Sequence, residues 1–273
     1  MSRVRTPAPA PTLPERRWRL SAMTWPEVEE AARRSRVVVI PTGSIEQHGP
    51  HLPVDTDTRL ATTICERAVA ELADEIGAVL APTIPFGAST LHTRFPGTID
   101  IGTDLFIALA VRVGKELIRS GFDRLLFLNG HGGNHAPLLV AAEHLHDAGA
   151  RVVAVTNHWT LAAQDIQAWR RSAPGGISHA GELETSLYLA IDETAVRTDR
   201  IPRELEGTKP RIPQESTDLV IGGAVRLTRR MHELSPSGVL GAPRYASTER
   251  GREILEREVE RLKELIRELH ALG

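Results

Sequence analysis

Short, unbroken runs of apolar residues, separated by longer helical patterns, constrain the fold of this chain more than any other feature of its sequence. Two runs lie at 37–40 and 125–128, and a third strand is expected at 151–155. A run without alternating polar residues is typical of a strand that is buried on both faces. Strands that alternate with helices indicate an α/β fold, in which helices flank a mainly parallel sheet on both faces.

The helical patterns between these runs complete the expected order of elements. Thr24 and Glu27 have the spacing of a helix start, in which each side chain caps the backbone near the other. Helices are expected at about 25–34, 58–76, 103–120, 135–148 and 248–271, with a further short strand near 78–82. The last helix carries one apolar stripe, which predicts packing on the body or on a sister subunit: Leu255, Val259, Leu262, Ile266 and Leu269.

The length of 273 residues permits one large domain or two small ones. Residues 1–17 hold four prolines and four arginines, cannot build a core, and are expected to form a flexible tail. We expect residues 18–273 to form a single domain. The stretch 201–245 is rich in proline, glycine and charge and is interpreted as long loops near the site.

Composition excludes several classes of protein. The formal net charge of −2 predicts no general affinity for nucleic acid or for an anionic membrane. No stretch approaches the roughly 18 apolar residues of a membrane span, and the N-terminus lacks the apolar core of a signal peptide, so a cytoplasmic location is expected. The single cysteine, Cys65, excludes an internal disulfide and a cysteine-based zinc cluster, and its apolar helical setting predicts a buried, inert thiol.

Polar residues gather in three clusters, each next to a predicted core element. The first, 43–57, follows the run 37–40; the second, 129–135, follows the run 125–128; and the third, 179–186, opens an apolar helix. Ligand sites in open α/β sheets lie off the carboxyl ends of the strands. Histidines and carboxylates meeting there without cysteine suit zinc, manganese or iron.

Each of these residues also has a simpler structural interpretation. A single histidine is often only hydrogen-bonded. Asp55 and Asp57 could cap the helix that follows them, since aspartate is a preferred cap. Glu182 and Glu184 could be favourable charges in the first turn of a helix. The metal-site interpretation gains weight because the three clusters occur together in one α/β chain.

The sequence resembles the creatininase family of metal-dependent amidohydrolases from about Leu20 to the final helix. The resemblance is carried by an ordered set of motifs: Gly-Ser-Ile-Glu-Gln-His-Gly at 43–49 with Asp57, Phe-Pro-Gly-Thr at 95–98, Asn-Gly-His at 129–131 and Glu-Thr-Ser at 184–186. It implies helices around a mainly parallel sheet and a centre of two divalent metal ions. It also implies a homo-oligomer, since members commonly form hexamers.

Roles follow from the resemblance position by position. It implies that Glu46 and His131 hold one metal, that His48 holds the other, and that Asp57 bridges them. His179 matches a catalytic histidine and Trp159 an aromatic residue that lines the substrate pocket.

The chain departs from creatininase itself at positions that bear on the substrate. Creatininase has a glutamate ligand where this chain has Gly133, a tyrosine where it has Gly132, and a pocket tryptophan where it has Gly175. Creatinine is therefore not the expected substrate. We expect Glu182 to supply the missing carboxylate, with Glu184 as the competing candidate, because side chains two positions apart on a helix point about 200° apart.

The resulting prediction is a hydrolase that uses a metal-activated hydroxide to cleave a carbon–nitrogen bond, other than a peptide bond, in a small cyclic amide or formamide-type molecule. His179 would supply the proton for the leaving nitrogen. His92 is expected to bind substrate at the pocket mouth, and His51 to orient a ligand or to be a solvated loop residue. The alternatives are deformylation of a purine-like formamide, cleavage of a small modified peptide, hydrolysis of a sugar-derived ring, or a non-catalytic binding module.

Overall fold

The computed structural model describes residues 18–35, 37–204, 207 and 210–272, so the tail expected at 1–17 lies outside the described residues. Four parallel strands form one sheet in the order β2-β1-β3-β4. These strands are β1 (Val37–Thr42), β2 (Val79–Leu80), β3 (Arg124–Asn129) and β4 (Val152–Asn157). The prediction of a mainly parallel α/β sheet is confirmed.

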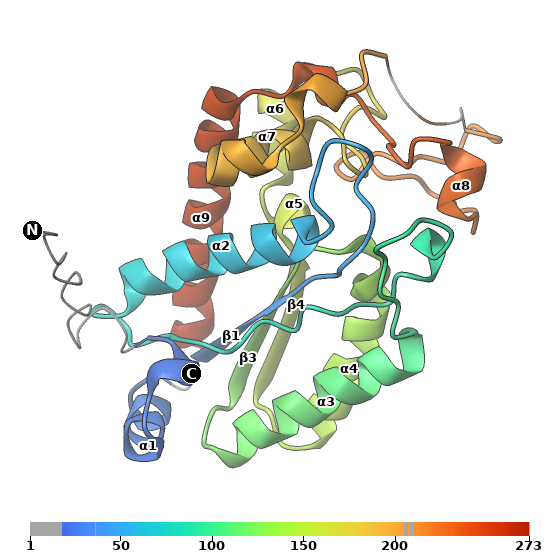
Figure 1. The fold of residues 1–273 in the computed structure, drawn as a ribbon. Helices are drawn as coiled ribbons and strands as arrows, with labels where there is room; N and C mark the ends of the chain where they lie inside the picture. Colours follow the sequence, from blue (N-terminus) through green and yellow to red (C-terminus); the bar gives the residue numbers. More distant parts are fainter. Residues whose placement is uncertain (1–17, 36, 205–206, 208–209, 273) are drawn as a thin grey trace, which may run out of the picture.

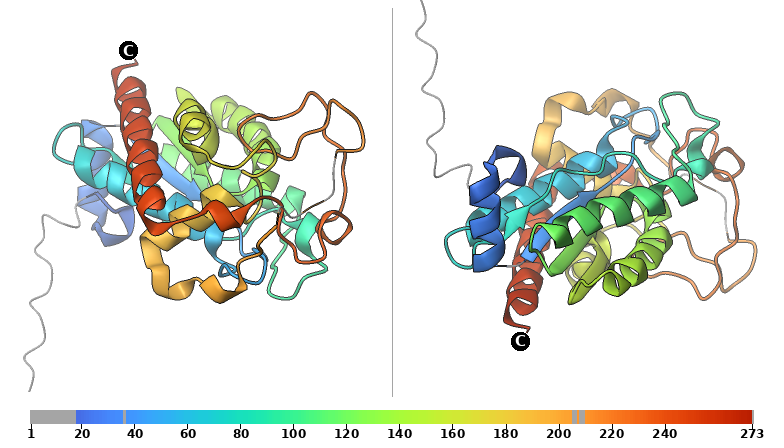
Figure 2. Two further views of the ribbon diagram at one scale, coloured as in Figure 1. Left: turned by 90° about the horizontal axis from the view of Figure 1, so that it is seen from above. Right: turned by 90° about the horizontal axis from the view of Figure 1, so that it is seen from below.

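Both faces of the sheet are covered (Figures 1 and 2). Successive residues of a strand point to opposite faces, so Val37 and Val39 pack on one side while Val38 and Ile40 pack on the other. The unbroken apolar runs exist because neither face meets water. The first face is covered by α2 (Thr56–Leu72), α5 (His158–Leu161), α6 (Ala163–Trp169), α7 (Glu182–Asp192) and α9 (Thr248–Ala271), and the second by α1 (Trp25–Arg34), α3 (Thr103–Arg119) and α4 (His135–Asp147).

Most expected elements are present with shifted ends. The strands β1 and β3 run past their apolar runs to polar residues, because Thr42 and Asn129 still pair across the sheet. β2 has only two residues. Within 201–245 the structure contains one short α-helix among its described residues, α8 (Met231–Leu234), so the interpretation as long loops largely holds.

Two predictions about buried side chains are confirmed. The whole apolar stripe of α9 is buried in the core on the first face of the sheet. Cys65 is fully buried, and burial raises the pKa of its thiol well above the ordinary value. No helix among the described residues is long and apolar enough to cross a membrane.

The register of the sheet decides where the polar clusters meet. Thr42 pairs with Asn129, and Asn129 pairs with Asn157. The segments that follow β1, β3 and β4 therefore leave the sheet side by side at one edge. The turn before α7 approaches the same edge, because α7 packs on both α2 and α9.

Candidate metal centre

A compact group of buried histidines and carboxylates lies at this edge of the sheet. One oxygen of Asp57 is 3.0 Å from Nε2 of His48, and the other is 3.1 Å from Nδ1 of His131. Oε2 of Glu46 is also 3.1 Å from Nδ1 of His131, and Oε2 of Glu184 is 3.8 Å from Nε2 of His48. Asp57 thus lies between two half-sites, Glu46–Asp57–His131 and His48–Asp57–Glu184.

The second nitrogen of each histidine is held by a backbone carbonyl. Nδ1 of His48 donates to the carbonyl of Glu46 at 3.1 Å, and Nε2 of His131 donates to the carbonyl of Ala88 at 3.1 Å. This arrangement directs the remaining nitrogen of each ring into the cluster. It is the arrangement that metal-binding histidines adopt.

The donor atoms fit a cation better than they fit one another. Nε2 of His48, Oε2 of Glu46 and Oδ2 of Asp57 are buried and lack a hydrogen-bond partner of good geometry, although each has an oppositely charged neighbour at 3.0–3.1 Å. Buried polar atoms that lie 3.0–3.1 Å apart without good hydrogen-bond geometry are arranged to bind a cation between them. A mixed set of imidazole and carboxylate donors suits zinc or manganese.

Protons compensate the charge in this cluster when no cation is bound. Burial alone would lower the pKa of His48, but Asp57 and Glu184 raise it to about 10. Burial raises the pKa of Glu184 to about 7, with the nearby Asp57 charge acting in the same direction. For Asp57 burial acts upward, yet His48 and His131 hold its pKa well below the ordinary value. Protons on His48 and Glu184 are therefore what a bound cation would have to displace.

The two glutamates at the start of α7 have separate environments, and the expectation for Glu182 needs correction. Both carboxylate oxygens of Glu182 accept backbone N–H groups, from Arg171 at 2.9 Å and Ser172 at 2.8 Å. Glu182 belongs to none of the candidate ligand groups among the described residues, whereas Glu184 does. The helix geometry that separates the two side chains directs Glu184 to His48 and Glu182 to the loop before α7.

Gly133 has no space for a side chain. A Cβ atom there would lie 2.4 Å from the carbonyl oxygen of Ala88 and 2.4 Å from Nε2 of His131. The segment 88–89 thus packs against the position at which creatininase carries a carboxylate. The contact that excludes a side chain here is also the one that orients His131.

Two further histidines share one glutamine. Gln47 donates from Nε2 to the carbonyl of Gly238 at 3.0 Å and to Nδ1 of His92 at 2.9 Å, which leaves the proton of His92 on Nε2, 3.4 Å from Glu46. His179 donates from Nε2 to the backbone carbonyl of Gln47 at 2.8 Å, so its Nδ1 is free, 3.6 Å from Glu46. His92 is buried beside Glu46 and lines the cavity over the cluster, and its contact with substrate stays a prediction.

The structure also places the two remaining residues of interest, Trp159 and His51, close to the cluster. Trp159 is buried and lines the cavity above the cluster. Nε2 of His51 contacts the hydroxyl of Thr185 at 2.9 Å, so His51 supports the start of α7 from behind. Burial and the neighbouring His48 lower the pKa of His51 to about 4.

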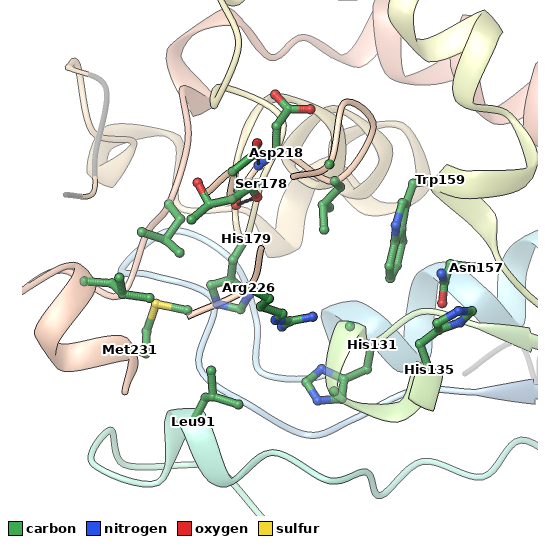
Figure 3. Close-up of a pocket in the computed structure, with 18 of the residues that line it drawn as sticks. Leu91, His131, His135, Asn157, Trp159, Ser178, His179, Asp218, Arg226 and Met231 are labelled. Atoms are coloured by element: carbon green, nitrogen blue, oxygen red, sulfur yellow. Dashed lines mark hydrogen bonds between the residues drawn. The ribbon is translucent and has the colours of Figure 1, made fainter. Parts of the chain in front are cut away.

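A cavity of about 660 Å³ opens over the cluster. His131, His135, Trp159 and His179 lie around it, and Arg226 extends into it from the segment 215–229 (Figure 3). Sequence reasoning did not single out Gln47, His135 or Arg226. Gln47 could have been found from its position between two ligands in the motif, whereas nothing in the sequence pattern distinguishes Arg226 from the other arginines of its loop.

Fold and site together define a class of α/β proteins that carry a histidine–carboxylate centre at the carboxyl edge of a parallel sheet. A sequence model of the Creatininase family, described as creatinine amidohydrolase, matches residues 21–266. The chain belongs to the creatininase family, whose members are hydrolases.

Particular relatives differ in what they act on. The chain is 37% identical over 223 residues to the mycofactocin precursor peptide peptidase of Mycobacterium tuberculosis, which covers 80% of this chain and 79% of the relative. It is 29% identical over 263 residues to creatinine amidohydrolase of Pseudomonas putida, covering 90% and 95%. A solved manganese form of creatininase superposes with a TM-score of 0.75 at 28% identity, covering 92% and 98%.

Proposed function

We propose that this chain is a metal-dependent hydrolase that holds two divalent ions, zinc, manganese or iron, and cleaves an amide bond in a peptide-like substrate. The position of Asp57 between the two half-sites, with one oxygen toward each, carries this proposal. Glu46 and His131 would complete one half-site, and His48 and Glu184 the other. Ions bound there would act as Lewis acids that polarise a carbonyl group and lower the pKa of water.

The size of the cavity favours a substrate larger than a single small ring. A volume of about 660 Å³ lies within the range of pockets that enclose drug-sized molecules. The similarity to a peptide peptidase supports the same substrate class. A small cyclic amide or formamide remains the second candidate, supported by the likeness to creatinine amidohydrolase over nine-tenths of the chain.

His179 is suited to move the proton that amide cleavage requires. Burial and the nearby His48 and His92 hold the pKa of His179 well below the ordinary value, so the ring is neutral at pH 7. Because its Nε2–H is engaged by the carbonyl of Gln47, Nδ1 is the free base. We propose that Nδ1 accepts the proton of the attacking water and passes it to the leaving nitrogen.

Other residues would position the substrate. The flat ring of Trp159 forms one wall of the cavity (Figure 3). The Nε2–H of His92 faces Glu46 and would keep that carboxylate in place. We also expect the chain to assemble as a homo-oligomer, with the hexamer as the expected state. Analytical ultracentrifugation would measure this.

Metal content tests the centre before any substrate is known. Protein purified without chelator should contain about two ions per chain, as a two-metal site requires. Asp57→Asn should lose them, because the shared ligand is removed. Asp55→Asn is the matched control, since Asp55 lies two residues away and binds the hydroxyl of Tyr188 at 2.8 Å instead. Equal metal loss in both variants, or no metal after reconstitution with zinc, manganese or iron, contradicts the proposal.

A substrate panel then tests the reaction. Metal-loaded protein is incubated with short peptides, with creatinine and with an N-formyl compound, and products are followed by mass spectrometry. Cleavage of a peptide that is lost in Asp57→Asn and His179→Ala supports the first candidate. Turnover of only the cyclic amide or the formamide supports the second. A metal-loaded protein that hydrolyses none of them contradicts the assignment as an amide hydrolase.

A further inference from the structure

Among the described charged residues around the cavity, one cation has no partner. Glu215 is paired with Arg229, and Asp218 with Arg170 at 2.8 Å, so both acidic side chains of the loop that lines the cavity are neutralised. The guanidinium of Arg226 forms no ion pair or hydrogen bond with the residues that the structure describes.

This cation borders the cavity. Arg226 is exposed to solvent, and Figure 3 shows its side chain extending toward the space between His179 and His131. An arginine on a solvent-exposed loop can also extend away from the protein. Here the side chain lines a cavity in which the nearby carboxylates of Glu215 and Asp218 are already paired.

The segment that carries Arg226 is fastened on both sides of it. The backbone N–H of Val225 donates to Gln214 at 3.1 Å, next to the Glu215–Arg229 ion pair. Earlier in the segment, the carboxylate of Asp218 accepts the N–H groups of Val220 and Ile221, each at 3.1 Å. These contacts hold the loop across the cavity, so Arg226 is presented before a ligand arrives.

We propose that Arg226 binds a carboxylate of the substrate, and that the enzyme selects amides with a free carboxylate near the bond to be cleaved, such as the C-terminal end of a peptide. A guanidinium presents paired N–H donors that match the two oxygens of a carboxylate. This inference rests on the proposed amide hydrolysis and specifies the substrate class. It assigns specificity, and not proton transfer, to Arg226.

Binding of a matched pair of probes tests the inference without requiring turnover. The probes are N-acetyl-alanyl-phenylalanine as the free acid and as its C-terminal amide, titrated calorimetrically into zinc-loaded protein at low salt. The acid should bind about tenfold or more tightly than the amide, as expected for a charge-assisted contact. In Arg226→Gln this ratio should fall to near one, and Arg226→Lys should retain part of it.

A control variant and a rival explanation complete the test. Arg252→Gln removes an exposed arginine of α9 outside the cavity and should keep the wild-type ratio. A carboxylate can also bind the metal ions directly. In that case Arg226→Gln keeps the preference for the acid, and the inference is overturned. Equal or undetectable binding of acid and amide to the wild type overturns it as well.

The two proposals fail in different measurements. Loss of metal or of all hydrolysis, with the acid-to-amide ratio intact and dependent on Arg226, counts against the proposed reaction alone. A metal-loaded, active enzyme without that ratio counts against the role of Arg226 alone. Melting temperature and zinc content of Arg226→Gln should equal those of the wild type, which shows that the fold and the centre are unchanged.

Discussion

At the scale of single residues, Glu182 and Glu184 lie on the same turn of α7 but have different contacts. Glu184 belongs to a candidate ligand group with His48 and Asp57, while Glu182 holds the loop before α7 by accepting two backbone N–H groups. Both are buried, so burial alone does not distinguish a ligand from a structural carboxylate. Their hydrogen-bond partners do.

This difference predicts how each glutamate responds to the same substitution. Glu184→Gln should lower the metal content by about one ion per chain, because an amide is a much weaker ligand than a carboxylate. Glu182→Gln should leave the metal content unchanged but destabilise the fold by about 1–3 kcal/mol, since one buried N–H loses a charged acceptor. Elemental analysis and thermal melting of both variants check this, and metal loss in Glu182→Gln would show that the assignment is reversed.

The sequence predicts which residues gather at the site where neighbouring strands bring them together, but not where their positions depend on distant tertiary contacts. Glu46, His48 and His131 could be placed together because they follow neighbouring parallel strands, whose carboxyl ends meet at one edge. Choosing between Glu182 and Glu184 required the rotation of α7 about its axis, which depends on its packing against α2 and α9. Arg226 lies in a loop fixed by distant ion pairs, and no periodic pattern encodes such contacts.

At the scale of elements, the contact between α7 and α9 supports the metal centre. Gly251 of α9 faces the backbone of α7 so closely that a Cβ atom would lie 1.7 Å from the carbonyl oxygen of Ser186. Ser186 follows Glu184 by two residues on α7. The position of α9 therefore fixes the helix that carries the proposed ligand Glu184.

Gly251→Ala should separate these two helices. Overpacking of this kind costs about 1–3 kcal/mol or more, so the melting temperature should fall. The shift of α7 should also weaken metal binding at Glu184. Arg252→Ala, at the adjacent exposed position of α9, is the control and should change stability by less than about 0.5 kcal/mol. If Gly251→Ala melts like this control, the close contact is relieved without moving α7.

At the scale of the whole molecule, we expect metal binding and folding to be coupled. The centre joins the loop after β1, the loop after β3 and the start of α7, so an unfolded chain cannot assemble it. Removing the metal with a chelator should therefore lower the melting temperature. At a hundredfold excess of free metal over its dissociation constant, the expected stabilisation is about 2.7 kcal/mol. Calorimetry over a series of zinc concentrations measures it, and a melting temperature independent of zinc would contradict the coupling.

The same coupling predicts a direction with pH. In the metal-free protein the pKa of His48 is raised to about 10 and that of Glu184 to about 7. Both groups bind protons more strongly when folded, so their stabilising effect is complete at low pH. It is lost as pH rises, from about 4.5 through 7 for Glu184 and from about 6.5 through 10 for His48.

Metal ions displace those protons, so the metal-loaded protein should show the opposite trend. Zinc affinity should rise about tenfold per pH unit for each proton released. The difference in melting temperature between the zinc-loaded and metal-free protein should therefore grow between about pH 6 and pH 8, where His48 of the metal-free site is still charged. Paired melting curves across this range test the prediction, with Asp57→Asn as the variant that should show no difference at any pH. A difference that shrinks as pH rises would mean that the ions do not replace the protons on these ligands.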